Sequence, residues 1–332
     1  MDFSLTEEEL MIYNTASEFG ENEVKSSVRE RDDNEVWADE LWNKMGALGF
    51  LGLPYEEQYG GGNANAFKTV LAMEGFGYGA EDAGLALAWG AHTILCGIPI
   101  FKLGTEAQKQ KYLPKMASGK WIGGFCLTEP GSGSDAAGMK TTAIKKDGYY
   151  LLNGSKTFIT NAPIGHHFVV TAITNPGHKA FGISTFIVEK NFKGFSIGKN
   201  MNKMGMRTST TSEVFFDNCE VPEENLLGQE NLGFVQTVKL ILGWERCCLL
   251  APAVGGLKKI GEKCLKYSIE RQQFNRPILK FQAIQKMIAN MKVDYEISRN
   301  LLYKVAWLID SGRDEEIIEA AAICKTYITE AS

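Results

Sequence analysis

One carboxylate stands inside an apolar stretch near the middle of the chain, LILGWERCCLLA, residues 240–251. On a helix, side chains three and four positions apart are neighbours. For Glu245 these neighbours are all apolar: Ile241, Leu242, Cys248 and Leu249. Apolar surroundings desolvate a carboxylate and strengthen it as a proton acceptor, which suits a general base that removes a weakly acidic proton. The alternative is an ion pair with a cation across a helix bundle.

A glycine- and serine-rich stretch, FCLTEPGSGSD, covers residues 125–135. Gly131 and Gly133 permit a tight turn, and the stretch also carries three hydroxyl groups, on Thr128, Ser132 and Ser134. Such a loop can present N–H groups and hydroxyls to a phosphate or a heterocycle. It matches neither a dinucleotide-binding GxGxxG nor a Walker loop, and a simple turn between domains remains the alternative.

Two further motifs carry aromatic and cationic side chains. KTFITN, residues 156–161, places Phe158 and Thr160 on one face of a strand, which suits either a flat ring system or the wall of a barrel. RQQFNRP, residues 271–277, puts two arginines at a helix-to-turn transition. Arginines there can bind a pyrophosphate, or they can simply be solvated.

The elements that must position these residues fall into three regions. Residues 1–120 have helical periodicity, with capping boxes at Thr6/Glu9 and Thr105/Gln108, and Pro114 is expected to end the second helix. Residues 121–227 contain β-branched and aromatic runs broken by turn residues, and the Asn-Gly pair in GYYLLNGSKTFIT predicts a β-hairpin. Residues 228–332 return to helical periodicity, beginning with a long helix that carries Glu245.

This order predicts an α+β protein with an N-terminal all-α domain (1–120), a central antiparallel β-barrel or sandwich (121–227) and a C-terminal helical bundle (228–332). The last residues, AAAICKTYITEAS, carry no helix stop signal. We therefore expect the C-terminal bundle to be incomplete.

Composition excludes several classes of function. The chain has 332 residues and a net charge of −5 without a basic block, which argues against nucleic acid or an anionic membrane as partner. No apolar run is expected to span a bilayer, so no membrane insertion is predicted. Seven cysteines without a CxxC pair indicate a reducing, cytoplasmic setting. Four scattered histidines give no metal site.

Taken together and in order, these motifs resemble the acyl-CoA dehydrogenase family over essentially the whole chain. The resemblance rests on DFSLTEEELMIYNTASEFGENEV, on FKLGTEAQKQKYLPKMASGKWIGGFCLTEPGSGSDAAGMKTTA, on KTFITNA, on MGMRTSTTSEVFFDNCEVPEENLLG and on RQQFNRPILKFQAIQ. It implies one FAD per subunit and assembly as a homotetramer. By position, the residues expected to contact FAD are Phe125, Leu127, Thr128, Gly133, Ser134, Phe158, Thr160, Arg271, Phe274 and Gln282.

The resemblance also gives Glu245 a role. A minority of the family, including isovaleryl-CoA dehydrogenases, carries its catalytic glutamate on this helix just before an arginine, as in the pair Glu245–Arg246. The implied reaction is dehydrogenation of a short or branched acyl-CoA to the trans-2-enoyl thioester, with Glu245 taking the α-proton and flavin N5 the β-hydride. Ser134, Trp244 and Arg246 are expected at the substrate, and electron transfer flavoprotein is the expected electron acceptor.

Two positions depart from the family pattern. Gly243 stands where many members have an aspartate that helps to seat CoA, and Asn275 replaces a common glycine. The first departure fits the same chemistry on an acyl or prolyl-like group tethered to a carrier protein, a branch that WERCC and ITNAPI also resemble. A non-catalytic paralogue and an oxidase or monooxygenase on the same scaffold are the further alternatives.

Overall fold

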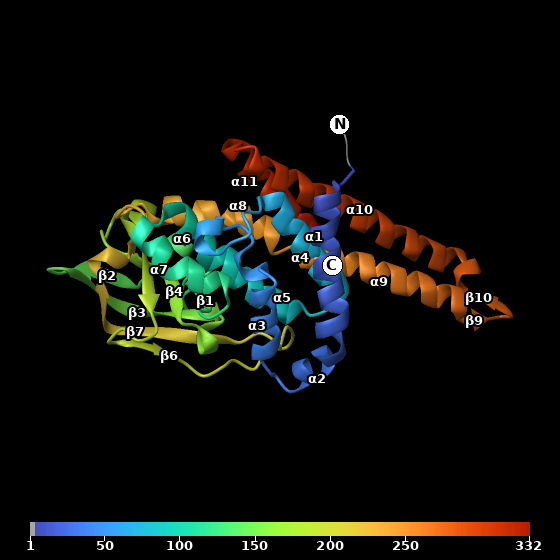
Figure 1. The fold of residues 1–332 in the computed structure, drawn as a ribbon, viewed down its shortest axis with the longest axis horizontal. Coiled ribbons are helices and arrows are strands. Elements are labelled where there is room, and N and C mark those ends of the chain that lie inside the picture. The colour runs from blue at the N-terminus through green and yellow to red at the C-terminus, as the bar shows by residue number, and fades with distance from the viewer. Residues whose placement is uncertain (1–3) are drawn as a thin grey trace. The chain divides into compact units, whose positions relative to one another are not determined.

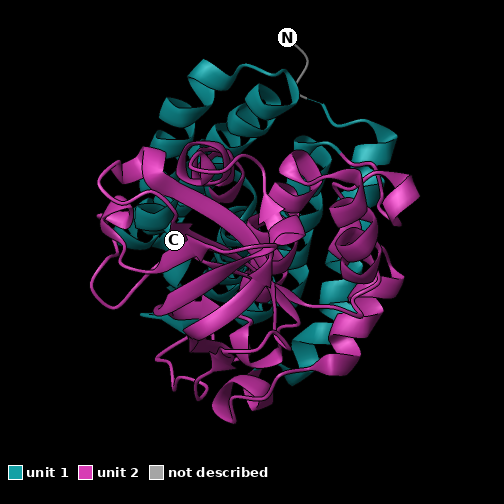
Figure 2. Cartoon of the chain, turned by 90° about the vertical axis from the view of Figure 1, so that its left-hand side faces the viewer, with its two compact units in different colours: residues 1–28, 65–86, 246–332 teal, residues 29–64, 87–245 magenta. Residues whose placement is uncertain are grey.

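The computed structural model describes residues 4–332, which form two compact units (Figure 2). The described residues of unit 1 are 4–28, 65–86 and 246–332, and those of unit 2 are 29–64 and 87–245. Three of the four borders between the units lie within short helices: α2 (Val28–Asp33), α5 (Ala83–Gly90) and α8 (Lys239–Cys248). The fourth lies between residues 64 and 65, just before α4 (Ala66–Ala80). The predicted domain boundaries at residues 120 and 227 stay a prediction.

Unit 1 is helical and is built around α4 (Ala66–Ala80) (Figure 1). This helix packs against α1 (Glu7–Phe19), α9 (Ala251–Glu270) and α10 (Gln282–Asp310), and α11 (Asp314–Ala331) packs on α10. The remaining elements of unit 1 are η1 (Gly20–Val24), η2 (Lys25–Ser27), β9 (Gln272–Gln273), β10 (Arg276–Pro277) and η11 (Ile278–Lys280). The two short strands pair as an antiparallel hairpin that joins α9 to α10.

Side chains fix the first turns of the unit 1 helices. Thr6 and Glu9 form the predicted capping box of α1, each accepting a hydrogen bond from the other's backbone N–H. At α4, the Asp310 carboxylate accepts from the N–H groups of Ala66 at 2.7 Å and Phe67 at 3.0 Å. An anion at a helix N-terminus satisfies donors that have no partner within the helix and opposes the positive end of its dipole. Asp310 thereby joins the end of α10 to the start of α4.

Unit 2 combines helices with the only large sheet of the described residues. Its helical elements after α2 are α3 (Asp39–Ala47), η3 (Phe50–Gly52), η4 (Glu57–Tyr59), η5 (Ala91–Gly97), α6 (Ile98–Leu103), α7 (Glu106–Ala117), η6 (Ala136–Gly138), η7 (Ala162–Ile164), η8 (Lys179–Gly182), η9 (Glu223–Asn225) and η10 (Phe234–Val238). The capping box predicted at Thr105 and Gln108 begins α7. The prediction that Pro114 ends this helix was wrong, because α7 continues to Ala117 with Leu113 and Met116 buried on either side of the proline.

Eight strands form the sheet: β1 (Gly123–Cys126), β2 (Thr142–Lys145), β3 (Tyr149–Thr160), β4 (His167–Ile173), β5 (Ile183–Glu189), β6 (Phe195–Ile197), β7 (Thr211–Pro222) and β8 (Leu226–Leu227). Their order is β6-β7-β3-β2-β4-β5-β8, with β1 added beside β4, parallel to it. A single residue pair, Thr142 with Ile173, joins β2 to β4. The path is open at both ends within residues 4–332, so the sheet is not a closed barrel.

The two halves of this sheet face each other across one core. Tyr150 of β3 contacts Phe186 of β5, with ring centroids 4.9 Å apart, although two strands separate them in the order. Phe168 of β4 likewise contacts Phe195 of β6 at 5.3 Å. The predicted α+β class with a central β-sandwich is therefore confirmed, because only two facing layers bring these rings together.

One predicted turn is wrong. Asn153 and Gly154 lie inside the single long strand β3 instead of at a hairpin turn, and the pairing with β7 shifts by one residue there. Gly154 has φ +144°, and a Cβ at this position would lie 2.6 Å from the Thr141 hydroxyl. The sheet therefore uses this glycine as a β-bulge. The hairpin between β2 and β3 turns instead at Asp147-Gly148, where Lys146 N–H donates to Tyr149 O at 2.8 Å.

The expectation that no apolar run could span a bilayer was also wrong. Two helical stretches, Ala83–Leu103 and Phe234–Glu270, are long and apolar enough by length and composition. The apolar window of the first is 83% buried and that of the second 50% buried. Core helices of soluble proteins meet the same criterion, so the two stretches do not by themselves indicate a membrane protein.

The packing of α9 on α4 generates the first prediction. A Cβ at Gly255 would lie 2.0 Å from the Glu74 carbonyl oxygen of α4, whereas a Cβ at the next residue, Gly256, would meet nothing within 4 Å. We expect Gly255→Ala to lower the free energy of unfolding by about 1–3 kcal/mol, because the two backbones must separate. The matched Gly256→Ala should raise it by about 0.5–1 kcal/mol, since alanine favours the helix. Urea unfolding of both variants measures the difference, and equal effects would contradict this packing.

Candidate functional site

Glu245 lies in the last turn of α8, a helix shorter than predicted. The π-helical segment η10 precedes α8, and a turn at Leu249 and Leu250 separates it from α9. Leu249 consequently lies outside the helix. Two of the other predicted neighbours are buried: Cys248 is 0% and Ile241 3% exposed, and Trp244 is buried beside the half-buried Glu245.

The loop after β1 presents open space beside its glycines. Phe125 in β1 and Leu127 and Thr128 just after it are half-buried, whereas Gly131, Gly133 and Ser134 are exposed. A Cβ on either glycine would meet nothing within 4 Å, and neither glycine has the left-handed φ that excludes other residues. Neither the backbone conformation nor a close contact within the chain therefore requires glycine at positions 131 and 133. Larger side chains at these positions would fill the space through which a bound group could approach the backbone.

Strand β3 turns an aromatic side chain outward. Phe158 has φ +59° and is 67% exposed, in the stretch where the register with β7 shifts between Lys156 and Ile159. A bulky residue at positive φ is strained, and such strain commonly marks a functional position. The exposed Phe158 and the half-buried Thr160 flank the buried Ile159.

The structure brings this loop and this strand together. Thr157 N–H donates to the Thr128 carbonyl at 2.9 Å, which places the predicted contacts at 125–128 beside those at 158 and 160. Glu245 belongs to the same unit, and Arg246 is the first residue beyond its border.

Sequence reasoning missed the pair of charged side chains that holds the two segments. Lys156 Nζ lies 2.8 Å from Glu129 Oε1, with the two side chains 0% and 7% exposed. Burial would raise the pKa of Glu129, but the Lys156 charge and the N–H groups of Thr141 and Lys140 outweigh burial and lower that pKa. Both residues stand within the quoted motifs, TEPGSGSD and KTFITN. Their position in these motifs draws attention to each residue, but nothing in the sequence indicates that the two form a pair.

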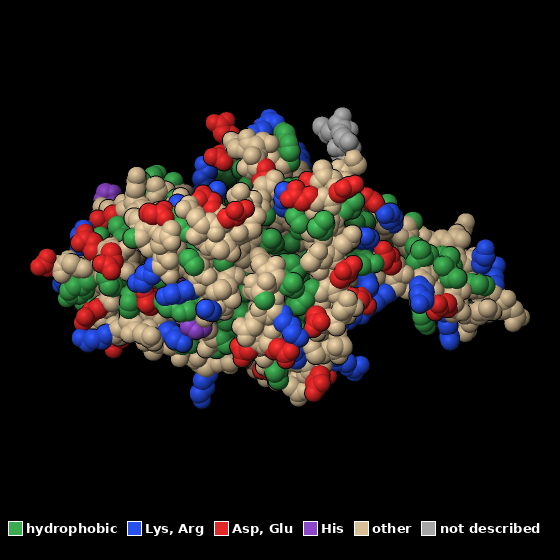
Figure 3. Space-filling model, in the orientation of Figure 1, with side chains coloured by type: hydrophobic (Ala, Val, Ile, Leu, Met, Phe, Trp, Pro, Cys, Tyr) green, Lys and Arg blue, Asp and Glu red, His purple; other side chains and the backbone are tan. Residues whose placement is uncertain are grey.

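Three of the residues predicted to contact FAD, Arg271, Phe274 and Gln282, lie on the α9–α10 hairpin of unit 1. Phe274 and Asn275 form its turn with φ +53° and +58°, a combination that type I′ hairpins require. Phe274 is 86% exposed, and Arg271 and Gln282 are exposed at the two ends of the hairpin. Figure 3 shows apolar and basic side chains side by side on this hairpin, at the right of the view.

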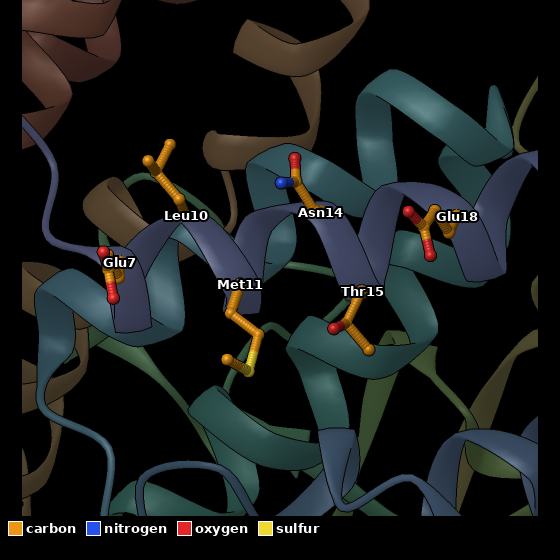
Figure 4. A pocket seen from close by; sticks show the side chains of 6 residues that line it. All are labelled: Glu7, Leu10, Met11, Asn14, Thr15 and Glu18. Carbon is orange, nitrogen blue, oxygen red and sulfur yellow. The ribbon is translucent and has the colours of Figure 1, made fainter.

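Two other features of unit 1 could be mistaken for a site. A pocket of about 430 Å³ is lined by α1 alone, through Glu7, Leu10, Met11, Asn14, Thr15 and Glu18 (Figure 4). Leu10 and Asn14 point to one side of the helix and Met11 and Thr15 to the other, so these residues form an open face without converging groups. The second feature is Glu74, a carboxylate that is 1% exposed.

The partners of Glu74 lie inside the helix bundle of unit 1. Burial raises the pKa of Glu74, while Tyr303 OH donates to it at 2.8 Å and Arg299 Nε lies 3.7 Å away. A carboxylate held by a hydroxyl and a guanidinium inside a helix bundle is a structural group. Glu74 is therefore not the predicted base, and Glu245 stays the predicted one.

The residues present fit FAD. An exposed, strained aromatic side chain at Phe158 suits a planar ring system, and the open glycine loop suits close approach of a ligand to backbone N–H groups. The exposed Arg271 supplies a cation suited to a pyrophosphate.

The open space at Gly133 generates a prediction. We expect Gly133→Val to weaken FAD binding at least about tenfold, because the new side chain would occupy space that the ligand needs. The melting temperature of the FAD-free protein should stay unchanged, since the added atoms meet nothing in the chain. Titration of the apoprotein with FAD measures the affinity. Gly205→Val, at another exposed glycine with no neighbour within 4 Å, is the matched control and should bind FAD normally.

Comparison with known proteins gives the family. The N-terminal, middle and C-terminal domain models of acyl-CoA dehydrogenases match residues 6–120, 124–219 and 231–332. A short-chain specific acyl-CoA dehydrogenase of Clostridium acetobutylicum is 41% identical over 94% of this chain and 82% of its own length. An L-prolyl-[peptidyl-carrier protein] dehydrogenase of a Serratia species is 37% identical over 95% and 82%. A solved structure of PigA with FAD and proline superposes with a TM-score of 0.91 at 34% identity, covering 100% of this chain and 88% of that one. The chain therefore belongs to the acyl-CoA dehydrogenase family.

Proposed function

We propose that the protein is an FAD-dependent dehydrogenase of acyl thioesters in which Glu245 is the catalytic base. The observation that carries this proposal is the half-buried position of Glu245 on α8, with Ile241 and Cys248 buried on the adjacent turns. The same unit contains the glycine loop and the outward-facing Phe158, which suit the isoalloxazine ring.

The reaction removes two hydrogens from neighbouring carbons. Glu245 takes the proton from Cα, and its apolar neighbours keep water from competing for that carboxylate. When bound, FAD supplies the acceptor for the hydride that leaves Cβ. Loss of H⁺ and H⁻ leaves the trans-2-enoyl thioester. Leu127 and Thr128 would hold the flavin ring from the loop, and Phe158 and Thr160 would hold it from β3. Arg271, Phe274 and Gln282 would bind the ADP half of FAD.

A short or branched acyl-CoA is the proposed substrate. Trp244, buried next to the base, restricts the space for the acyl chain, and Ser134 and Arg246 would contact the thioester ligand. A second candidate is the same chemistry on an acyl or prolyl-like group tethered to a carrier protein. Gly243, in place of an aspartate that helps to seat CoA, favours this candidate, as does the similarity to the Serratia carrier-protein dehydrogenase.

The proposal includes electron transfer flavoprotein as electron acceptor, a homotetramer as the assembly, and the cytoplasm as location. The seven cysteines are all free thiols in the structure, which suits a reducing compartment. The electron acceptor and the homotetramer are inferred from the resemblance to the acyl-CoA dehydrogenase family.

Substitution of the base tests the mechanism. We expect Glu245→Gln to keep FAD bound while slowing anaerobic flavin reduction by substrate about 10²–10⁴-fold, because the amide cannot accept the α-proton. Stopped-flow bleaching of the visible flavin band measures the rate. Glu319→Gln, an exposed substitution of the same kind on α11, should reduce its flavin at the wild-type rate. Full-rate reduction in Glu245→Gln would rule out this base.

The substrate class is tested with the wild-type protein. We expect bleaching by short or branched acyl-CoAs, whereas bleaching only by an acyl- or prolyl-loaded carrier protein would transfer the function to carrier-bound substrates. A colourless protein that cannot be reconstituted with FAD would indicate a non-catalytic paralogue. Rapid peroxide formation in air without electron transfer flavoprotein would indicate an oxidase.

A further inference from the structure

Lys156 and Glu129 form an ion pair whose contacts run through both segments of the candidate flavin site. Beyond Glu129, the Lys156 ammonium donates to the Leu127 carbonyl at 3.1 Å. The Glu129 carboxylate in turn accepts from Lys140 N–H at 2.6 Å and Thr141 N–H at 3.0 Å. The pair therefore fixes the start of the loop through Leu127 and closes it at residues 140–141, on the far side of Gly131 and Gly133.

The contact with Leu127 also sets the direction of one peptide group. In a planar trans peptide the C=O and the N–H point in opposite directions. Because the Leu127 carbonyl points at Lys156, the N–H of Thr128 in the same peptide points to the opposite side of the loop. The next carbonyl, of Thr128, accepts from Thr157 N–H at 2.9 Å, and the N–H that shares its peptide, of Glu129, donates to Ser132 O at 3.0 Å. Thr128 N–H is thus the donor that this arrangement turns away from the Lys156 ammonium.

The ammonium changes the strength of that donor as well. A hydrogen bond accepted by a carbonyl polarises its peptide and strengthens a bond donated by the same peptide, by about 10–30%. A charged donor with 0% exposure exerts this effect without screening by water. Lys156 is also followed two residues later by the outward-facing Phe158, so the same side chain holds the strand from which the aromatic residue projects.

We propose that Lys156 and Glu129 are positioning residues for the flavin: they aim and polarise the N–H of Thr128 toward the isoalloxazine ring and thereby tune the reduction potential of bound FAD. The inference rests on the proposed assignment of this loop to the flavin. Reduction places negative charge on the ring, so a polarised donor stabilises the reduced form more than the oxidised form. Neither side chain needs to contact the cofactor.

The test is the double variant Lys156→Met with Glu129→Gln, which removes both charges together and so avoids an unpaired buried charge. We expect FAD affinity to fall, and the reduced form to lose about tenfold more affinity than the oxidised form. That ratio corresponds to a midpoint potential about 30 mV lower for a two-electron couple. Spectroelectrochemistry of the loaded protein gives the potential, and titration of the apoprotein gives the affinity.

The matched control is Lys193→Met with Glu220→Gln, an ion pair of 2.8 Å between the turn before β6 and strand β7, whose side chains are 82% and 45% exposed. It should leave affinity and potential unchanged. Should the methionine variant fail to fold or to bind FAD, Lys156→Gln with Glu129→Gln allows the same comparison, because it keeps a neutral donor for Leu127.

An unchanged potential in the variant that binds FAD would overturn the proposal, since a purely structural pair would alter stability and affinity only. Failure of the flavin assignment itself gives a different result. In that case Gly133→Val would also bind FAD normally. If Gly133→Val weakens FAD binding while the double variant keeps the wild-type midpoint potential, only the role of the ion pair is rejected.

Discussion

A lysine ammonium shut off from solvent needs acceptors that replace its water, because an unpaired charge in a protein interior costs several kcal/mol. Lys156 finds these acceptors in the Glu129 carboxylate and the Leu127 carbonyl. Satisfying one side chain therefore dictates the course of two chain segments. The loop after β1 must bring residues 127 and 129 to the lysine, and β3 must keep that lysine inward while Phe158 turns outward.

Much of the fold could be predicted because its signals are local. The capping boxes at Thr6 and Thr105 identify where two helices begin, since their hydrogen bonds join residues three positions apart. The β-branched and aromatic runs likewise predicted the strands of the central region. The prediction failed where contacts with residues distant in the sequence determine the local conformation. Asn153-Gly154 has the sequence of a hairpin turn, yet the approach of Thr141 and the pairing with β7 make it a bulge within a strand.

In the candidate site, too, local features could be predicted from the sequence and contacts between distant residues could not. The apolar surround of Glu245 followed from helical spacing, because Ile241 and Cys248 are neighbours on one helix. The break after Cys248 could have been read from Pro252 in the first turn of α9, since proline restricts the residue before it and cannot donate a hydrogen bond. The ion pair between Glu129 and Lys156 could not be predicted from the sequence, because the two residues are 27 positions apart and no local pattern joins them.

The hydrogen bonds of Asp310 have a consequence for how the protein is made. They join α4 to a residue 244 positions later in the chain. A ribosome adds about 5–20 residues per second, so α4 waits on the order of tens of seconds for the carboxylate that caps it. Most of unit 2 emerges during this interval, and its sheet contains no strand from the last segment. Nascent chains should therefore complete the sandwich first, while the apolar faces of α1 and α4 are open to chaperones until translation reaches α10.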